Sequence, residues 1–309
     1  MTSTVPPTDH QGSTTTASDG LLHFPPSSAL ALEPHLPPPT LNPNSSSKPG
    51  SKPFVTLTFA TSLDSSLSLA PGVRTTLSGP QSKAMTHYLR SRHSAILVGV
   101  GTAVADDPGL NCKILSPSGL GKGVREQHPN QPRPIVLDPS ARWKVNERSK
   151  VVQLARLKQG LGPYIFVTRE GMEKVTAERR KMVESVGGKF VCVESSLDSK
   201  GEAEERKTTG FVWEDVLRTI REEGLDSVMI EGGGSVINSL LTLEQAGGQE
   251  LVDSVIVTIA PTWLGAGGVL VCPPRAIGKD GQPAPPVRLR DVSWHPLGED
   301  VVLCGKILR

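Results

Sequence analysis

The chain has 309 residues, a formal net charge of +2 and only 4% aromatic residues. A nearly neutral chain without a basic stripe or many aromatic side chains is not typical of a nucleic-acid-binding protein. No apolar run approaches the ~18 residues that a membrane span needs, and the N-terminus resembles neither a signal peptide nor a transit peptide. We therefore expect a cytoplasmic protein that binds neither nucleic acid nor membranes.

Proline, serine and threonine dominate the start of the chain: of the first 53 residues, 11 are Pro and 16 are Ser or Thr. The apolar residues there are few and scattered, so the segment is not expected to bury enough surface to offset the entropy of ordering it. We predict a disordered tail over residues 1–52 and a single domain over residues 53–309. Deletion of residues 1–50 is accordingly expected to leave activity intact.

Short apolar runs recur through the rest of the chain and predict strands. They span residues 54–60, 95–100, 134–138, 164–168, 189–194, 227–231, 254–260 and 301–308. Helical spacing predicts helices over residues 81–92 and around 171–186, 213–223 and 235–243. Strands that alternate with helices indicate an α/β fold with a mainly parallel, buried central sheet flanked by helices.

The four cysteines, Cys112, Cys192, Cys272 and Cys304, lie far apart and form no C-x-x-C motif. This spacing does not favour a zinc site, and we interpret the cysteines as reduced thiols. No metal site is expected.

A run of three glycines follows the predicted strand at 227–231, in the sequence VMIEGGGSVINSL at 228–240. Glycines let the backbone approach an anion closely, and the free N–H groups at a helix start favour phosphate. The run therefore suits a dinucleotide phosphate site, and it equally suits a tight strand-to-helix turn. Neither the Rossmann nor the P-loop fingerprint is present.

A second candidate is LVGVGTAVADDPGL at 97–110, where a buried strand leads into a short segment with Thr102 and Asp106. These two residues are four apart, so they share a face if the segment is helical. A hydroxyl and a carboxylate at the carboxyl end of a strand suit the hydroxyls of a ribose. The alternative is that Asp106, Asp107 and Pro108 only terminate the helix.

A third candidate is Asp64, which follows the first strand and could hold a substrate amine or orient a sugar hydroxyl; the alternative is a turn residue. Arg90, near the end of its predicted helix, either complements the helix dipole or clamps a phosphate. His87 and His93 are six apart, which does not align them on one helix face, so we interpret them as surface or packing residues.

Together these segments resemble the reductases of the riboflavin pathway, both the stand-alone fungal type and the reductase half of the bacterial deaminase–reductase. The resemblance covers residues 53–309 and is carried by GVGT-x-x-ADDP at 99–108 and EGGG at 231–234. The H-x-E and P-C-x-x-C strings of a zinc deaminase do not occur.

The resemblance implies a dihydrofolate-reductase-like fold, a homodimer, NADPH as hydride donor and a ribosylaminopyrimidine 5′-phosphate as substrate. It implies a cofactor site formed by Ala60, Thr102, Asp106, Val193, Glu231, Gly232, Gly233, Gly234, Ser235 and Val236. It implies substrate contacts from Asp64, Arg90, Leu110, Lys113 and Glu231, with Glu231 and Asp64 in the catalytic role.

The chain departs from the family at two positions. Ser65 stands where relatives commonly have glycine, so its turn must adopt a conformation that a non-glycine residue tolerates. Lys113 stands where relatives often have arginine, and lysine offers a point charge rather than a fork.

The expected reaction is reduction of the ribosyl side chain of 2,5-diamino-6-ribosylamino-4(3H)-pyrimidinone 5′-phosphate, in which an imine at C1′ of the sugar accepts hydride. Glu231 and Asp64 are expected to bind the pyrimidine or the sugar hydroxyls, and Arg90 with Lys113 the phosphate. The sequence names no general acid, so water is the expected proton source. Two alternatives remain: a reductase of the same fold acting on a pterin or folate, and a non-catalytic nucleotide-binding protein.

Overall fold

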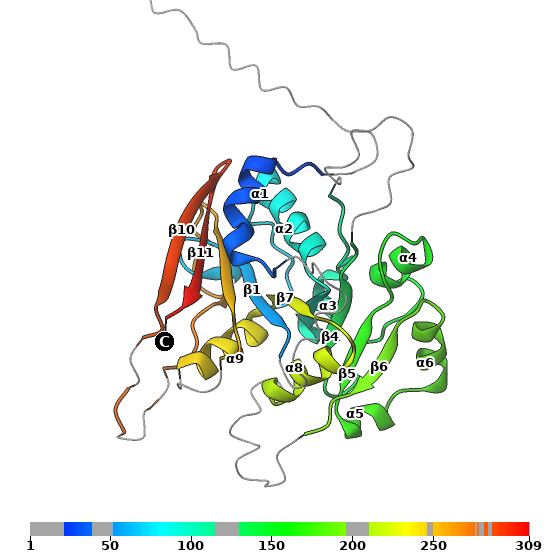
Figure 1. Cartoon of the computed structure of the whole chain (residues 1–309). Coiled ribbons are helices and arrows are strands. Elements are labelled where there is room, and N and C mark those ends of the chain that lie inside the picture. The colour runs from blue at the N-terminus through cyan, green and yellow to red at the C-terminus, as the bar shows by residue number, and fades with distance from the viewer. Residues whose placement is uncertain are drawn as a thin grey trace, which may run out of the picture.

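A nine-stranded sheet forms the centre of the molecule (Figure 1). The structure is a computed structural model that describes residues 22–38, 52–114, 130–195, 210–245, 250–275, 277, 281–283 and 286–308. The strands of this sheet are β1 (Phe54–Thr61), β3 (Ala95–Gly99), β4 (Arg133–Leu137), β5 (Tyr164–Val167), β6 (Lys189–Cys192), β7 (Ser227–Gly232), β8 (Ser254–Ile259), β10 (Leu289–Leu297) and β11 (Asp300–Ile307). A separate pair joins β2 (Ser66–Ser68) to β9 (Val269–Leu270).

The strands lie in the order β10-β11-β8-β1-β7-β3-β4-β5-β6, and only β10 and β11 run antiparallel to their neighbours. The remaining pairs are parallel. The carboxyl ends of β1, β7, β3 and β4 therefore meet at one edge of the sheet, the position where open α/β sheets bind ligands. We call it the carboxyl edge. The expected mainly parallel α/β fold is confirmed.

The helices are α1 (Pro26–Leu32), α2 (Pro80–Arg92), α3 (Val100–Asp106), α4 (Lys150–Arg156), α5 (Arg169–Glu173), α6 (Ala177–Glu184), α8 (Trp213–Glu222) and α9 (Gly234–Gln245), with a 3-10 turn η1 (Glu33–His35). The helix predicted around 171–186 is divided into α5 and α6. The break lies at Thr176, whose hydroxyl accepts the N–H of Arg179 and so caps α6.

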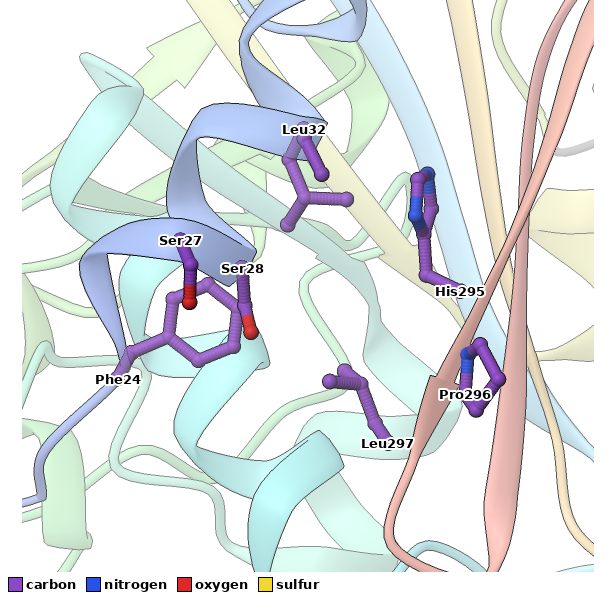
Figure 2. Close-up of a pocket in the computed structure, with 8 residues that line it drawn as sticks. Phe24, Ser27, Ser28, Leu32, His295, Pro296 and Leu297 are labelled. Atoms are coloured by element: carbon purple, nitrogen blue, oxygen red, sulfur yellow. The ribbon is translucent and has the colours of Figure 1, made fainter.

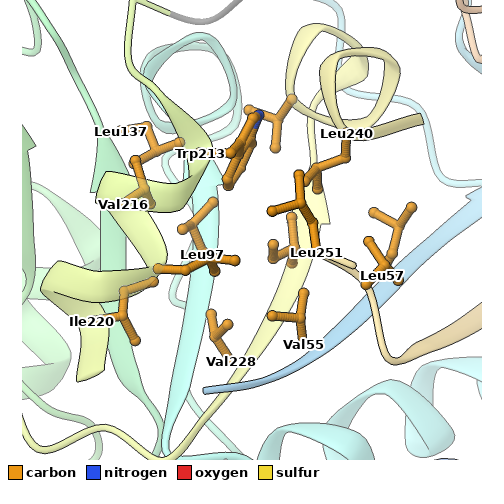
Figure 3. Close-up of a cluster of buried hydrophobic side chains, with 14 of the residues drawn as sticks. Val55, Leu57, Leu97, Leu137, Trp213, Val216, Ile220, Val228, Leu240 and Leu251 are labelled. Atoms are coloured by element: carbon orange, nitrogen blue, oxygen red, sulfur yellow. The ribbon is translucent and has the colours of Figure 1, made fainter. Parts of the chain in front are cut away.

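Alternate residues of the central strands face opposite sides of the sheet, and each side is covered by helices. On one side, Val55, Leu97 and Val228 pack with α8 and α9, including the fully buried Trp213 (Figure 3). On the other side, α2 and α1 cover Met229 and its neighbours. Burial of each such large side chain stabilises the fold by about 1.5–3 kcal/mol.

Residues 22–38, which we call the N-terminal segment, correct the expectation of a disordered tail over residues 1–52. They form α1 and η1 beside α2 (Figure 1). Phe24, Leu32 and Leu36 are buried against side chains of α2 and residues 112–114. The prediction from composition was wrong for this segment because a few apolar residues at suitable spacing are enough to order it once they can pack on a partner surface. Residues 1–21 and 39–51 lie outside the described residues.

Polar contacts also fasten the N-terminal segment to α2. Glu33 forms an ion pair with Arg92 and accepts the hydroxyl of Tyr88 at 2.6 Å. The N–H of Leu22 donates to the carbonyl of Lys113 at 2.7 Å. The segment is thus joined to both α2 and the strand-like stretch around residue 113.

Two of the hollows on the described surface lie away from the predicted site, because none of the predicted site residues lines either of them. A hollow of about 260 Å³ lies between α1 and β10, lined by residues such as Phe24, Ser28 and His295 (Figure 2). A second, of about 610 Å³, lies where β1, β3 and β7 begin, next to Phe54, Ser94 and Ser227. Both are therefore distinct from the carboxyl edge.

Candidate functional site

The glycine run forms the turn between β7 and α9. Gly232 has φ +107°, a backbone conformation that requires glycine, and the peptide bond between Gly232 and Gly233 is cis. A Cβ atom on Gly233 would lie 2.9 Å from Oγ1 of Thr102, and one on Gly234 would lie 2.4 Å from Val269. Packing alone therefore accounts for the glycines as a tight turn at the carboxyl edge, in which Gly232 and Gly234 are buried and Gly233 is half-buried.

Thr102 joins this turn to the segment after β3. Its Oγ1 accepts the N–H of Gly233 at 2.9 Å. The segment is helical as α3, so Thr102 and Asp106 lie on one face as expected. The two motifs of the sequence, far apart along the chain, thus meet through a hydrogen bond.

Asp106 and Asp107 have different roles. Asp107 ends α3 with φ +41°, and its carboxylate accepts the N–H of Lys150 at the start of α4. Asp106 remains half-buried, and burial raises the pKa of its carboxyl, opposed by the positive charge of Arg74. The turn role therefore belongs to Asp107, which leaves Asp106 available for a ligand.

Arg90 of α2 and Glu231 of β7 form a bidentate ion pair on one side of the sheet. On β7, Val228 and Ile230 face one side of the sheet, so Glu231 faces the other, which α2 covers. Nε and Nη2 of Arg90 each donate to a carboxylate oxygen of Glu231 at 2.8 Å. The side chains are 15% and 18% exposed. Burial lowers the pKa of Arg90, but the carboxylate outweighs it, so the net shift is upward.

The third donor of Arg90 fixes the segment that carries Lys113. Nη1 of Arg90 donates to the carbonyl of Asn111 at 3.1 Å. The N–H of Lys113 donates to Nδ1 of His87 at 3.1 Å, while the lysine side chain remains exposed. The predicted substrate residues Arg90, Glu231 and Lys113 are thus connected through one hydrogen-bonded group.

His87 and Asn111 were not predicted for this group. His87 precedes Arg90 by three residues on α2, so both side chains lie on one face, a spacing already visible in the sequence. Burial, and then the positive charges of Arg90, Lys113 and Lys83, lower the pKa of His87 to about 3. The ring is therefore neutral near pH 7, and Nδ1 can accept a hydrogen bond.

Leu110 differs from the other predicted substrate residues because its side chain is only 2% exposed. Its φ is +50°, an unusual conformation for a residue with a branched side chain. It belongs to the buried hydrophobic cluster that also contains Val98 and Val151. Only its backbone is therefore placed to meet a ligand.

Asp64 makes contacts typical of a turn. Its carboxylate accepts the N–H groups of Leu264 at 3.2 Å and Gly265 at 2.7 Å, and the hydroxyl of Ser62. The hydrogen bond from Ser62, followed by those from the two backbone groups, lowers the pKa of Asp64. Ser65 takes φ +61°, so this turn adopts the left-handed conformation with a non-glycine residue.

Two predicted cofactor residues, Ala60 and Val193, lie on or directly after strands other than those that lead into the glycine turn and Thr102. Ala60 is half-buried near the end of β1 and pairs with Thr258 of β8. Val193 follows β6 at the far edge of the sheet, and its side chain, 7% exposed, packs into the core. The structure does not bring Val193 together with the glycine turn.

The described residues contain no group of three or more His, Cys, Asp or Glu side chains arranged to hold a metal ion. In the same part of the chain, no helix is both long and apolar enough to cross a membrane. The four cysteines are unpaired.

Comparisons with known proteins match this chain over most of its length. Residues 53–303 match the family described as the RibD C-terminal domain. The chain is 39% identical over 257 residues to the 2,5-diamino-6-ribosylamino-4(3H)-pyrimidinone 5′-phosphate reductase of Saccharomyces cerevisiae, covering 82% of this chain and 87% of the relative. A relative of the same name from Debaryomyces hansenii is 35% identical over 291 residues, covering 93% of this chain and 99% of the relative.

A solved structure agrees with these matches. The riboflavin biosynthesis reductase of Saccharomyces cerevisiae superposes with a TM-score of 0.64 at 33% identity, and the match covers 91% of this chain and 100% of that one. Because this coverage exceeds what residues 53–303 alone supply, the match extends outside the family domain.

Proposed function

Because this chain belongs to the RibD C-terminal domain family, we propose that it is the riboflavin-pathway reductase that converts 2,5-diamino-6-ribosylamino-4(3H)-pyrimidinone 5′-phosphate to its ribitylamino product. The observation that carries the proposal is the Arg90–Glu231 pair beside the Thr102-bound glycine turn, at the carboxyl edge of the sheet. The matches to two relatives with this name cover more than four fifths of this chain and more than four fifths of each relative.

Membership in a reductase family implies a nicotinamide nucleotide as hydride donor, and we propose NADPH. The residues at the carboxyl edge fit such a group. Gly101 is exposed at the start of α3, and a Cβ atom there would meet only Arg142, at 4.0 Å. Backbone N–H groups at the starts of α3 and α9, with an arginine beside them, are the donors that phosphates favour. The proposed contacts are those of Ala60, Thr102, Asp106 and residues 231–236, with Val193 contributing only through its backbone.

NADPH, when bound, supplies the hydride that reduces C1′ of the opened sugar, and the nitrogen takes its proton from water. The chain supplies position and charge. Glu231, held by Arg90, has lone pairs left to accept hydrogen bonds from the amino groups of the pyrimidine. Asp64, tied to Leu264 and Gly265, shapes the neighbouring loop and faces the substrate with its remaining lone pairs.

Lys113 is the residue that binds the phosphate of the substrate in the proposed complex. Arg90 already uses three of its five N–H donors on Glu231 and Asn111. It therefore contributes mainly charge, whereas the exposed ammonium of Lys113 is free to approach an anion. Leu110 directly precedes the segment that carries Lys113, and only its backbone is proposed to contact the substrate.

We also propose a cytoplasmic homodimer whose reductase domain spans residues 53–309, with the N-terminal segment packed on it. β10 is an edge strand, and its Val292 and Trp294 are 44% and 57% exposed on one face. Exposed apolar side chains on an edge strand favour association. Analytical ultracentrifugation of wild type and Trp294→Glu tests it: a dimer that becomes a monomer supports this surface, and a wild-type monomer contradicts it.

The experiment that tests the activity is NADPH oxidation by the purified protein with the diamino pyrimidine phosphate, its deaminated counterpart, dihydrofolate and dihydropterin side by side. We expect turnover with the diamino compound to exceed that with the others. Preference for the pterin or folate would favour the alternative reductase, and tight NADPH binding without any turnover would favour a non-catalytic protein.

A further inference from the structure

The main-chain groups of residues 111–113 are bonded by side chains from other parts of the chain. Nη1 of Arg90 donates to the carbonyl of Asn111 at 3.1 Å. Gln131 bonds both main-chain groups of Cys112: its Oε1 accepts the N–H at 2.9 Å, and its Nε2 donates to the carbonyl at 3.0 Å. Because these contacts come from α2 and from the residue two positions before β4, they fix the stretch relative to the sheet.

Lys113 is bonded through both of its main-chain groups. Its N–H donates to Nδ1 of His87 at 3.1 Å, and its carbonyl accepts the N–H of Leu22 at 2.7 Å. The residues on either side, Cys112 and Ile114, are only 2% and 5% exposed, whereas Lys113 is exposed. These contacts therefore fix the backbone of a cation whose side chain is free to meet an anion.

His87 is suited to hold this backbone because its ring is buried and neutral. It is 6% exposed within α2, and Sγ of Cys112 donates to its carbonyl at 3.1 Å. Burial, followed by the positive charge of Arg90, lowers the pKa of His87 to about 3. Because Nδ1 accepts the N–H of Lys113, the proton of the neutral ring lies on Nε2. His87 thus remains an acceptor for Lys113 near neutral pH.

From this geometry we propose that His87 is a positioning residue for the substrate, and that it acts by fixing the main chain that carries the ammonium group of Lys113. The inference rests on the proposed function, because it takes the 5′-phosphate of the substrate as the anion that Lys113 meets. Lysine is a compact charge on a flexible stem, so the position of its backbone limits where the charge can reach. Without His87, the N–H of Lys113 loses its partner, and the present backbone position is disfavoured.

A purely structural role for His87 predicts a different result from a positioning role. Loss of packing would weaken the binding of every ligand, whereas displacement of Lys113 weakens only the binding of ligands that carry the phosphate. The diamino pyrimidine 5′-phosphate and its dephosphorylated ribosylamino counterpart differ in this group alone. Dissociation constants of these two compounds and of NADPH, measured by calorimetry, therefore separate the two roles.

The variants differ in whether they keep the acceptor. His87→Leu removes it, and His87→Asn keeps an oxygen at the position of Nδ1. His93→Leu is the matched control, because His93 is also a buried histidine but bonds Thr56 and the carbonyl of Leu89. Thermal unfolding verifies that each variant is folded at the temperature of the measurement. Should His87→Leu be unfolded, His87→Gln replaces it, since its longer side chain carries the oxygen to the position of Nε2.

We expect His87→Leu to weaken binding of the phosphorylated compound about tenfold, while binding of the dephosphorylated compound and of NADPH stays within about twofold of wild type. His87→Asn should restore most of the affinity, and His93→Leu should stay within about twofold for all three ligands. Added to Lys113→Met, the change His87→Leu should weaken binding by less than a further twofold or so, because the charge that His87 positions is already absent.

Three results would overturn the proposal. One is an equal loss for the phosphorylated and dephosphorylated compounds in His87→Leu, and another is the same loss in His93→Leu; both would assign His87 a structural role alone. The third is binding of the phosphorylated compound by His87→Leu within about twofold of wild type.

These outcomes are distinct from failure of the proposed function, because binding requires no turnover. A wild-type protein that binds the phosphorylated compound but does not reduce it with NADPH contradicts the reaction, while the comparison of the His87 variants still decides the positioning role. A wild-type protein that binds the phosphorylated compound no more tightly than the dephosphorylated one contradicts the roles of Lys113 and His87 together.

Discussion

Helix α2 serves two regions with similar chemistry and different purposes. Toward the carboxyl edge, Arg90 pairs with Glu231 where a ligand can approach. Toward the N-terminal segment, Arg92 pairs with Glu33, and Tyr88 donates to the same carboxylate. Both are arginine–carboxylate pairs on one helix, so the existence of an ion pair does not identify a functional site. What differs is the neighbourhood: a glycine turn and α3 on one side, buried apolar side chains on the other.

We expect the packing of α1 on α2, in the N-terminal segment, to govern stability rather than catalysis. Leu32, 2% exposed, is the deepest apolar residue of α1, and Leu32→Ala is expected to lower the free energy of unfolding by about 3 kcal/mol. Chemical denaturation measures the change. Leu30→Ala is the control, because Leu30 is 73% exposed in the same helix and should change stability by less than about 0.5 kcal/mol. Equal effects of the two substitutions would mean that the segment does not pack as described.

The other side of the comparison concerns activity. Glu231→Gln keeps the shape of the side chain but removes its charge, and it is expected to lower kcat/KM about 100-fold, or about 2.7 kcal/mol. Glu33→Gln makes the same change in the other pair and should lower kcat/KM less than about twofold. Steady-state kinetics of both variants measures these changes. Similar losses of kcat/KM in the two variants would contradict a functional difference between the two regions.

Two buried histidines, His87 within α2 and His93 directly after it, predict a pH dependence of stability. Burial and then nearby positive charge lower the pKa of His87 to about 3, and burial lowers that of His93 to about 4. Below the ordinary histidine pKa of about 6.5 the unfolded chain binds protons that the folded chain does not, so stability falls as the pH falls. Between pH 7 and pH 5 each histidine should contribute a loss of about 1–2 kcal/mol, measurable by urea titration.

His87→Asn places an oxygen where Nδ1 accepts the N–H of Lys113, and His93→Asn removes the second ionisable group. Each variant should reduce the loss of unfolding free energy between pH 7 and pH 5 by the contribution of the histidine that it replaces. A profile that is equally steep in both variants would show that other groups cause the acid sensitivity.

The smallest effect is expected at Ser65, in the loop beside Asp64. Its φ of +61° is cheaper for glycine, so Ser65→Gly should raise the free energy of unfolding by at most about 1 kcal/mol while leaving NADPH binding unchanged. Thermal unfolding measures the gain. A destabilised variant would mean that the loss of chain entropy outweighs the relief of strain.

The sequence predicted the central strands because they are covered on both faces and read as continuous apolar runs. β10 has mostly exposed residues and contains Pro296, so it lacked that pattern and was missed. The N-terminal segment was missed for a related reason: the burial of Phe24 and Leu32 depends on α2, which no local pattern reveals.

The candidate site was predictable in parts. The sequence indicated each of the glycine turn, Thr102 and Glu231 as a candidate. It did not predict the contacts between distant residues, such as the ion pair of Arg90 and Glu231, which are 141 positions apart. The role of Asp107 as a cap for α4 also depends on a contact across 43 positions.

The expected effect of deletion changes with the structure. Removal of residues 1–50 takes away α1 and the N–H of Leu22 that binds Lys113, so it is now expected to destabilise the domain and to disturb the segment of Lys113.

Isotope labelling tests most directly whether hydride is transferred to C1′ of the sugar. The protein is incubated with the diamino pyrimidine phosphate and NADPH carrying two deuterium atoms at C4 of the nicotinamide, and the product is analysed by mass spectrometry and NMR. We expect a ribitylamino product with one deuterium atom, located at C1′. A product without deuterium, or with deuterium at any other carbon, would contradict it.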